Sequence, residues 1–162
     1  MSSFYSIDHR KYGDAATATA QHLIDCDADP FVPSGWTVES HRKGGQFAFD
    51  HAKIKLYLSP NQRNGKIING NKLRKELANE PVLNANVLDY LLKNPNLIPE
   101  QRKKDESGNT LYIFFWGTIY RYSNDDLCVR FMFYSGSLLN YGNSSLDLDW
   151  DDNDPAALLA SY

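Results

Sequence analysis

Four side chains with acid–base and metal-binding chemistry lie close together in the first third of the sequence. They are Glu39, His41, Asp50 and His51. Imidazole and carboxylate groups together can bind a divalent metal or transfer a proton. A β-hairpin that turns at Gly44-Gly45 would place the last two residues opposite the first two. This leaves open a metal-dependent hydrolase, although the polar outer face of an ordinary hairpin carries the same residue types.

Positive charge gathers between residues 42 and 75, where nine basic side chains face a single acid. The candidates for binding nucleic acid or phosphate are Arg42, Lys43, Lys53, Lys55, Arg63 and Lys66. Phe47, Phe49 and Tyr57 lie among them, and single-stranded nucleic acids bind such mixtures through base stacking and phosphate neutralisation. The alternative is a solvated basic face, which the net charge of −3 and the lack of a nucleic-acid-binding motif favour.

Negative charge gathers at the other end of the chain, where residues 123 to 162 carry seven aspartates and one base. Asp147, Asp149 and Asp151 match the start of an EF-hand loop, but its glycine and its closing glutamate are missing. The sequence therefore predicts no metal site here. Such an acidic patch can dock on a basic partner, or it can simply keep exposed strands from pairing.

Aromatic residues make up 13% of the chain, and five of them alternate along residues 111 to 122. Tyr and Trp are frequent in protein-binding hot spots, so an uncovered face of this strand would be a binding surface. The alternative is a core with a rim of tyrosines. The candidate protein-binding residues are Tyr112, Trp116, Tyr120, Tyr122, Asp147, Asp149, Trp150 and Asp151.

Hydrophobic periodicity predicts the elements that position these groups. Helices are expected over residues 14–26, 71–78 and 85–93, the last with Asn84 as its N-cap. Strands are expected over residues 36–41, 46–50, 53–58, 111–122, 127–134 and 145–150. The expected core joins Ile113, Phe115, Ile119, Val129 and Phe131 to Leu88, Leu91 and Leu92.

These elements predict a single α+β domain over residues 1–162. Its antiparallel sheet of about five or six strands, arranged as hairpins or a meander, packs against two to four short helices. Residues 1–13 are expected to be an irregular lead-in, and residues 155–162 a short C-terminal turn.

Several function classes lack their sequence signatures. There is no glycine-rich phosphate loop, no G-x-S-x-G and no H-E-x-x-H, and we predict no cofactor. Cys26 and Cys128 belong to no Cys-x-x-Cys pair and are expected to be small buried residues. The longest apolar run, residues 111–116, is too short to span a membrane, so a cytoplasmic location is expected by default.

The segments PVLNANVLDYLLKNPNLIPE and YIFFWGTIYRYSNDDLCVR carry a resemblance. They resemble a group of small bacterial proteins that share a NANVLDYLL–NPxLIPE segment followed by a FFWGTIYR strand. That group has no established activity, so the resemblance implies no site residue. Where a tryptophan-rich C-terminal hairpin is expected, this chain has Tyr134 and Tyr141.

Three functions remain open at this point. The first is a non-catalytic protein-binding role, of the inhibitor, immunity or accessory kind, through an aromatic and acidic surface. The second is nucleic-acid binding through residues 42–75, and the third is a metal-dependent hydrolase around His41 and His51. The expected partner is another protein, and the sequence leaves the oligomeric state open.

Overall fold

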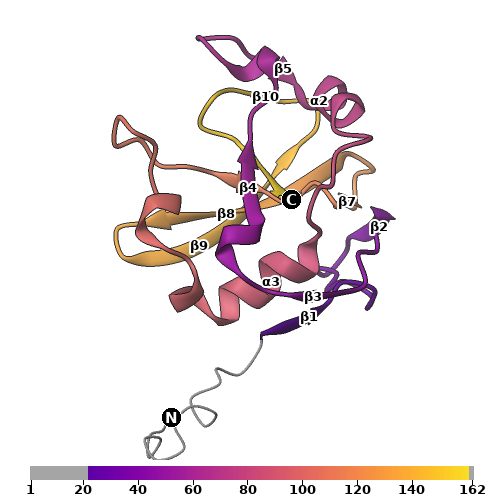
Figure 1. Ribbon diagram of the computed structural model, residues 1–162. Coiled ribbons are helices and arrows are strands. Elements are labelled where there is room, and N and C mark those ends of the chain that lie inside the picture. Colours follow the sequence, from indigo (N-terminus) through magenta and orange to yellow (C-terminus); the bar gives the residue numbers. More distant parts are fainter. Residues whose placement is uncertain (1–21, 161–162) are drawn as a thin grey trace, which may run out of the picture.

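The computed structural model describes residues 22–160, which form a curled sheet with helices packed against it (Figure 1). Seven strands of the described chain share this sheet. Along one path their order is β2 (Thr37–His41), β7 (Thr118–Arg121), β8 (Leu127–Ser135), β6 (Ile113–Phe114), β11 (Ala156–Leu159) and β4 (Ile54–Tyr57). β9 (Leu138–Ser145) is eight residues long and pairs with β8 along the edge opposite β6 and β7. The α+β prediction is confirmed.

The sheet is mixed, so the prediction of a purely antiparallel sheet is wrong. β11 runs parallel to β6, with Ala156 opposite Phe114, and antiparallel to β4. The predicted turn over residues 155–162 is therefore a strand in its described part. Ala156 to Leu158 are buried between two neighbouring strands, and this tertiary pairing overrides the helix preference of alanine and leucine.

The predicted long strand over residues 111–122 is two strands, and both pair with β8. Gly117 lies at the break between β6 and β7. A Cβ atom there would lie 2.8 Å from backbone atoms of Leu83 and Asn84, and the Gly117 amide donates to the Leu83 carbonyl at 2.9 Å. The strand is interrupted because the chain just before α3 (Ala85–Lys93) packs directly against this glycine.

The helix over residues 85–93 forms as predicted. The Asn84 side chain accepts a hydrogen bond from the Asn86 amide at the N-terminus of α3, and the helix ends before Pro95. α2 (Gly70–Glu76) begins in the same way, with the Asn69 side chain accepting from the Asn71 amide. The polar caps in the sequence therefore locate both helix starts to within two residues.

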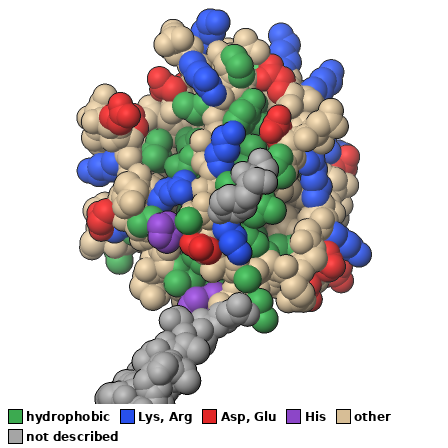
Figure 2. Space-filling view, in the orientation of Figure 1, with side chains coloured by type: hydrophobic (Ala, Val, Ile, Leu, Met, Phe, Trp, Pro, Cys, Tyr) green, Lys and Arg blue, Asp and Glu red, His purple; other side chains and the backbone are tan. Residues whose placement is uncertain are grey.

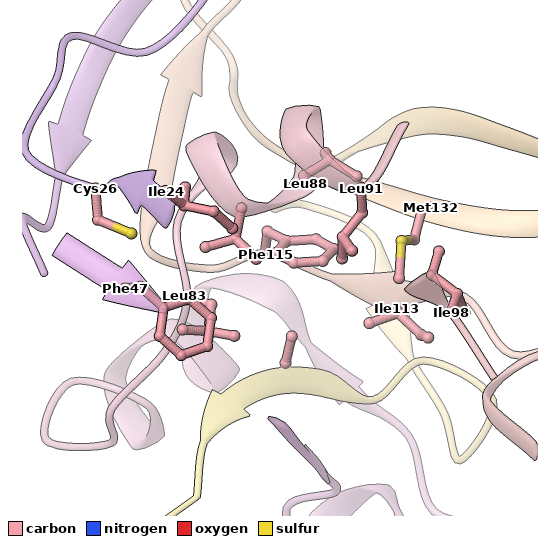
Figure 3. Close-up of a cluster of buried hydrophobic side chains, with 12 residues drawn as sticks. Ile24, Cys26, Phe47, Leu83, Leu88, Leu91, Ile98, Ile113, Phe115 and Met132 are labelled. Atoms are coloured by element: carbon pink, nitrogen blue, oxygen red, sulfur yellow. The ribbon is translucent and has the colours of Figure 1, made fainter. Parts of the chain in front are cut away.

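Buried side chains fill both faces of the sheet, because successive residues of a strand point to opposite sides. Figure 3 shows the first cluster, in which Leu88 and Leu91 of α3 pack towards Phe115, Ile113 and Met132. On the opposite face, Leu73 of α2 and Leu77 just after it are buried in a second cluster. Its main members are Leu73, Leu77, Trp116, Ile119, Val129 and Trp150. The predicted core is thus divided between two faces.

Two short pairings overturn two local predictions. β1 (Leu23–Asp25) pairs with β3 (Gln46–Ala48), and β5 (Ile68–Asn69) pairs with β10 (Asp149–Trp150). Residues 23–25 are therefore strand and not the end of a helix, and only Ile24 of the three is buried. The rest of the predicted helix, like the expected lead-in over residues 1–13, lies outside the described residues. Of the strand expected over residues 145–150, Ser145 ends β9 and only Asp149 and Trp150 form β10.

The predicted hairpin of residues 36–41 and 46–50 does not form. β2 pairs with β7 at the margin of the large sheet, whereas β3 pairs with β1. The Arg42 amide extends the first pairing by donating to the Gly117 carbonyl at 2.7 Å. Gly45, at φ 70°, then turns the chain away, a conformation that glycine adopts without steric cost.

Candidate functional site

The four residues of the predicted metal or catalytic cluster are not brought together. The cluster depended on the missing hairpin, and β2 carries Glu39 and His41 to a different strand pairing from Asp50 and His51. In residues 22–160 no three His, Cys, Asp or Glu side chains are grouped so that they could bind a metal ion. The geometry therefore gives no support to the predicted hydrolase site.

The His41 imidazole has a structural role instead. Its Nδ1 lies 2.9 Å from Thr118 Oγ1, and its Nε2 lies 3.1 Å from the Ala28 carbonyl oxygen. Because a carbonyl only accepts, Nε2 carries the proton, and the Thr118 hydroxyl donates to Nδ1. That hydroxyl oxygen also accepts from the Ala85 amide at 2.9 Å. Both ring nitrogens are thus used in joining β2, β7 and α3 to the loop at residue 28.

The other three members of the cluster are also engaged locally. Glu39 forms an ion pair with Arg121 at 2.7 Å, and the hydrogen bond from Arg121, followed by its charge, lowers the pKa of Glu39. Asp50 caps the short 3-10 helix His51–Lys53 by accepting from the Ala52 amide. The His51 carbonyl accepts from Arg102. These contacts are those of surface turns and strand margins.

The two cysteines are buried and free, as the sequence predicts. Burial is the main cause that raises the pKa of Cys26 and of Cys128 to about 11. Both therefore remain thiols at neutral pH. Since the thiolate is the nucleophile and the metal ligand, neither cysteine is suited to catalysis.

The predicted basic binding segment is partly used in holding the backbone. Arg42 donates to the carbonyls of Leu77, Ala78 and Glu80 just beyond α2, at 2.8 to 3.1 Å. Arg63 donates to the Leu58 carbonyl, and Lys55 lies over the Tyr57 ring. Lys43 and Lys66 are exposed, and Lys53 is half-buried. Figure 2 shows Lys and Arg side chains scattered over this face and not gathered into one patch.

The predicted acidic residues form successive turns and not a chelating site. The Asp147 carboxylate accepts from Asn71, and the Asp151 carboxylate accepts from the Asn153 amide. Asp149 is exposed in β10. Asp154 is different, because burial, supported by the charges of Asp151 and Asp152, raises its pKa to about 7. Its Oδ2 accepts from the Asp151 amide at 3.0 Å, which fixes the turn before β11.

Three of the five aromatic residues predicted to bind a partner are buried, so they do not form the surface that the sequence predicted. Trp116, Tyr120 and Trp150 are at most 4% exposed. The break at Gly117 and the pairing of β10 bring the indole rings of Trp116 and Trp150 together, with their centroids 5.3 Å apart. Tyr112 and Tyr122 are half-buried. The aromatic face thus became core, and a rim of tyrosines surrounds it.

A different exposed aromatic surface surrounds Arg130. This arginine is 3% exposed, and its two terminal nitrogens donate to both carboxylate oxygens of Asp89, at 2.9 and 3.1 Å. Burial lowers the pKa of Arg130, but the hydrogen bonds and charge of Asp89 outweigh it and raise the pKa. Phe31 and Tyr141 lie against the guanidinium, at 5.8 and 5.6 Å, and are 62% and 63% exposed.

Hydrogen bonds and ring contacts hold this surface in place. The Tyr120 hydroxyl donates to the Phe31 carbonyl at 2.8 Å. Trp36 meets the rings of Tyr120 and Tyr122 edge-on, with centroids 5.4 and 5.0 Å away. The Tyr122 hydroxyl is hydrogen-bonded to Asn143 of β9. We call this the Arg130 surface, and its members are Phe31, Val32, Trp36, Tyr122 and Tyr141.

Sequence reasoning missed Phe31, Val32 and Asp89. One signal for the first two was present, because they are a pair of large apolar residues in a loop between Pro30 and Pro33. An apolar pair that no strand or helix buries is expected to be exposed. No comparable signal indicated that Asp89 pairs with Arg130, since the pairing depends on how α3 crosses β8.

Comparison with known proteins adds no relative: no protein-family model, no curated protein and no solved structure matches this chain. The resemblance of the NANVLDYLL segment therefore stays a prediction. In the described residues no helix has the length and apolar character needed to cross a membrane.

Proposed function

We propose that this protein is a non-catalytic binding protein, of the inhibitor, immunity or accessory kind, which engages another protein through the Arg130 surface. The observation that carries the proposal is the exposure of Phe31 and Tyr141 beside the buried guanidinium of Arg130. Exposed aromatic side chains beside an arginine have the composition of an interaction hot spot.

Preorganisation supports the same proposal. Tyr120 fixes the loop of Phe31 through a hydrogen bond, and Trp36 packs against both Tyr120 and Tyr122. Side chains that are already held in place lose little conformational entropy when a partner binds. A partner therefore gains the burial of two large rings without having to order them.

The charge around this surface favours a basic partner. Asp25, Asp27 and Asp29 are exposed in the segment that leads to Phe31, and Asp125 and Asp126 are exposed in the turn after Tyr122. Acidic residues at the rim of an interface steer an oppositely charged protein towards it and speed its association. We therefore expect lysine or arginine side chains on the matching face of the partner.

Affinity capture with matched variants tests the proposal. Tagged wild-type protein, the double variant Phe31→Ala/Tyr141→Ala and the control Ile67→Ala are each used to capture proteins from a lysate of the source cells. Ile67 is 64% exposed, like the two aromatics, but it lies next to β5. We expect one partner to be retained by wild type and by Ile67→Ala and lost by the double variant.

Two results would contradict the proposal. Equal recovery of the partner by the double variant would place the interface elsewhere on the chain. If the purified protein turned over a substrate, and neither the double variant nor Ile67→Ala changed that turnover, the protein would be an enzyme.

A further inference from the structure

We propose that a second site, distinct from the Arg130 surface, binds a small organic anion. It is a cavity of about 290 Å³ between β2, β7 and the end of α2. Its polar lining residues are Ser40, His41, Arg42 and Arg74, and its apolar wall includes Trp116 and Ile119. The expected ligand class is a carboxylate or a phosphate monoester on a compact apolar body.

The charge of the lining selects for an anion. Among the residues that line this cavity are two arginines and a histidine, and there is no carboxylate. The closest acid along β2 is Glu39, which pairs with Arg121 at 2.7 Å. The charge of Arg74 also contributes to the lowered pKa of Glu39, after the larger effect of Arg121. An anion that enters the cavity therefore meets positive charge that no lining acid neutralises.

Arg74 is the residue with donors to spare. In the described chain its guanidinium makes one side-chain hydrogen bond, from Nη2 to Ser40 Oγ, at the long distance of 3.4 Å. Arginine has five N–H donors in a planar fork, which matches two oxygens of a carboxylate or phosphate. Arg42 already donates to three carbonyl groups beyond α2. It therefore contributes positive charge and a fixed part of the cavity wall, but few free donors.

The Trp116 indole reports on this cavity. Trp116 is 4% exposed and lines the same cavity as Arg74. Its Nε1, like that of Trp150, is buried and has no hydrogen-bond partner in residues 22–160. An anion bound to Arg74 would lie beside the Trp116 ring, so we expect it to change the surroundings of this indole.

The size of the cavity limits the ligand. A volume of about 290 Å³ equals that of roughly ten liquid water molecules. This lies at the lower end of small-molecule sites, so the part of the ligand inside the cavity is expected to be compact. The buried side chains of Trp116, Ile119 and Leu77 provide an apolar wall, so the body attached to the anionic group is expected to be apolar.

The test is a titration of the full chain by NMR, with the indole N–H signals of the three tryptophans as the readout. The probes are benzoate, phenyl phosphate and neutral benzamide, and Trp116→Phe assigns the Trp116 signal. We expect benzoate, phenyl phosphate or both to shift that signal at millimolar concentration, and benzamide to leave it unchanged. The stronger of the two anions then identifies the ligand as carboxylate or phosphate.

Arg74→Gln and the control Lys72→Gln complete the experiment. Lys72 is exposed on the same helix and does not line the cavity. Losing the charge-assisted hydrogen bonds should weaken anion binding about ten- to a hundredfold in Arg74→Gln and hardly at all in Lys72→Gln. Because Arg74→Gln could misfold, the comparison of benzoate with benzamide on the wild-type protein stands without it.

The proposal is overturned if neither anion shifts the Trp116 signal, or if benzamide shifts it as strongly as benzoate. It is also overturned if the two glutamine variants are both folded and bind the anions equally. These outcomes do not affect the proposal for the Arg130 surface, because the substitutions and the readout lie at a separate site.

Discussion

Arg130 and Asp89 connect the stability of the domain to its proposed interface. A buried guanidinium needs its carboxylate, because desolvated charge without a partner is costly. The same guanidinium supports the rings of Phe31 and Tyr141, which are the most exposed members of the Arg130 surface. A change in this pair should therefore affect both folding and binding.

Replacing Asp89 with Ala should destabilise the protein strongly, by about 3 to 5 kcal/mol, because Arg130 is left buried and unpaired. Replacing both residues, as Asp89→Leu/Arg130→Met, should recover much of that loss. Urea unfolding, monitored by circular dichroism, measures the stability of both variants. If the single variant unfolds at the same urea concentration as the wild type, the ion pair is not buried as described.

Asp154 should make stability depend on pH. Burial raises the pKa of this carboxyl from 3.8 to about 7, so the folded protein holds the proton more tightly than the unfolded chain. Its contribution to stability is therefore fully present below about pH 4 and is lost as the pH rises through 7.

Asp154→Asn removes that charge and keeps an oxygen to accept from the Asp151 amide. Relative to wild type, the variant should be more stable at pH 8 by roughly 1 to 2 kcal/mol, after allowance for solvent screening, and nearly equal at pH 4. Thermal unfolding at both pH values measures this. The exposed Asp152→Asn is the control, and a gain that is the same at pH 4 and pH 8 would refute the explanation.

Among the elements, one close contact is that of Gly117 with the chain that enters α3. It joins the break between β6 and β7 to the helix that covers one face of the sheet. The Asn84 side chain strengthens the same junction, because it donates to the carbonyls of Cys26 and Arg42 while it caps the helix. One glycine and one asparagine thus fix where α3 crosses the sheet.

Gly117→Ala tests that junction. The new Cβ would lie 2.8 Å from backbone atoms that no side-chain rotation can move, so we expect a loss of at least about 2 kcal/mol. Gly44→Ala is the matched control, since its Cβ would meet Cys26 at an ordinary 3.4 Å. Chemical denaturation of both variants gives the comparison, and equal stability would contradict the proposed contact.

At the scale of the whole molecule, local signals predicted local structure well. Asn84 and Pro95 bounded α3, and the alternation of residues 127–134 gave β8. Long-range pairing was not predictable in this way. Nothing in residues 36–41 and 46–50 distinguishes a hairpin from two strands that pair with β7 and β1, because the residue pattern of a strand does not specify which strand it pairs with.

The candidate site shows the same division. Tyr112 and Tyr122 are half-buried, which fits the alternative of a core with a rim of tyrosines, but alternation could not show that Trp116 and Trp150 would meet in the core. The Arg130 surface combines a proline-flanked loop, a helix and two strands, so no continuous stretch of sequence carries its pattern. Only the folded chain places these residues together.

If a partner protein sits on Phe31 and Tyr141, site-specific photo-crosslinking in the source cells should capture it there. A benzophenone amino acid is placed at Phe31, and in a separate protein at Ile67, which is equally exposed near β5. We predict a crosslinked species of one defined mass from position 31 that Asp89→Ala weakens, and none from position 67. A crosslink from position 67 alone, or the same products from both positions, would show that no partner is bound specifically at Phe31 and Tyr141.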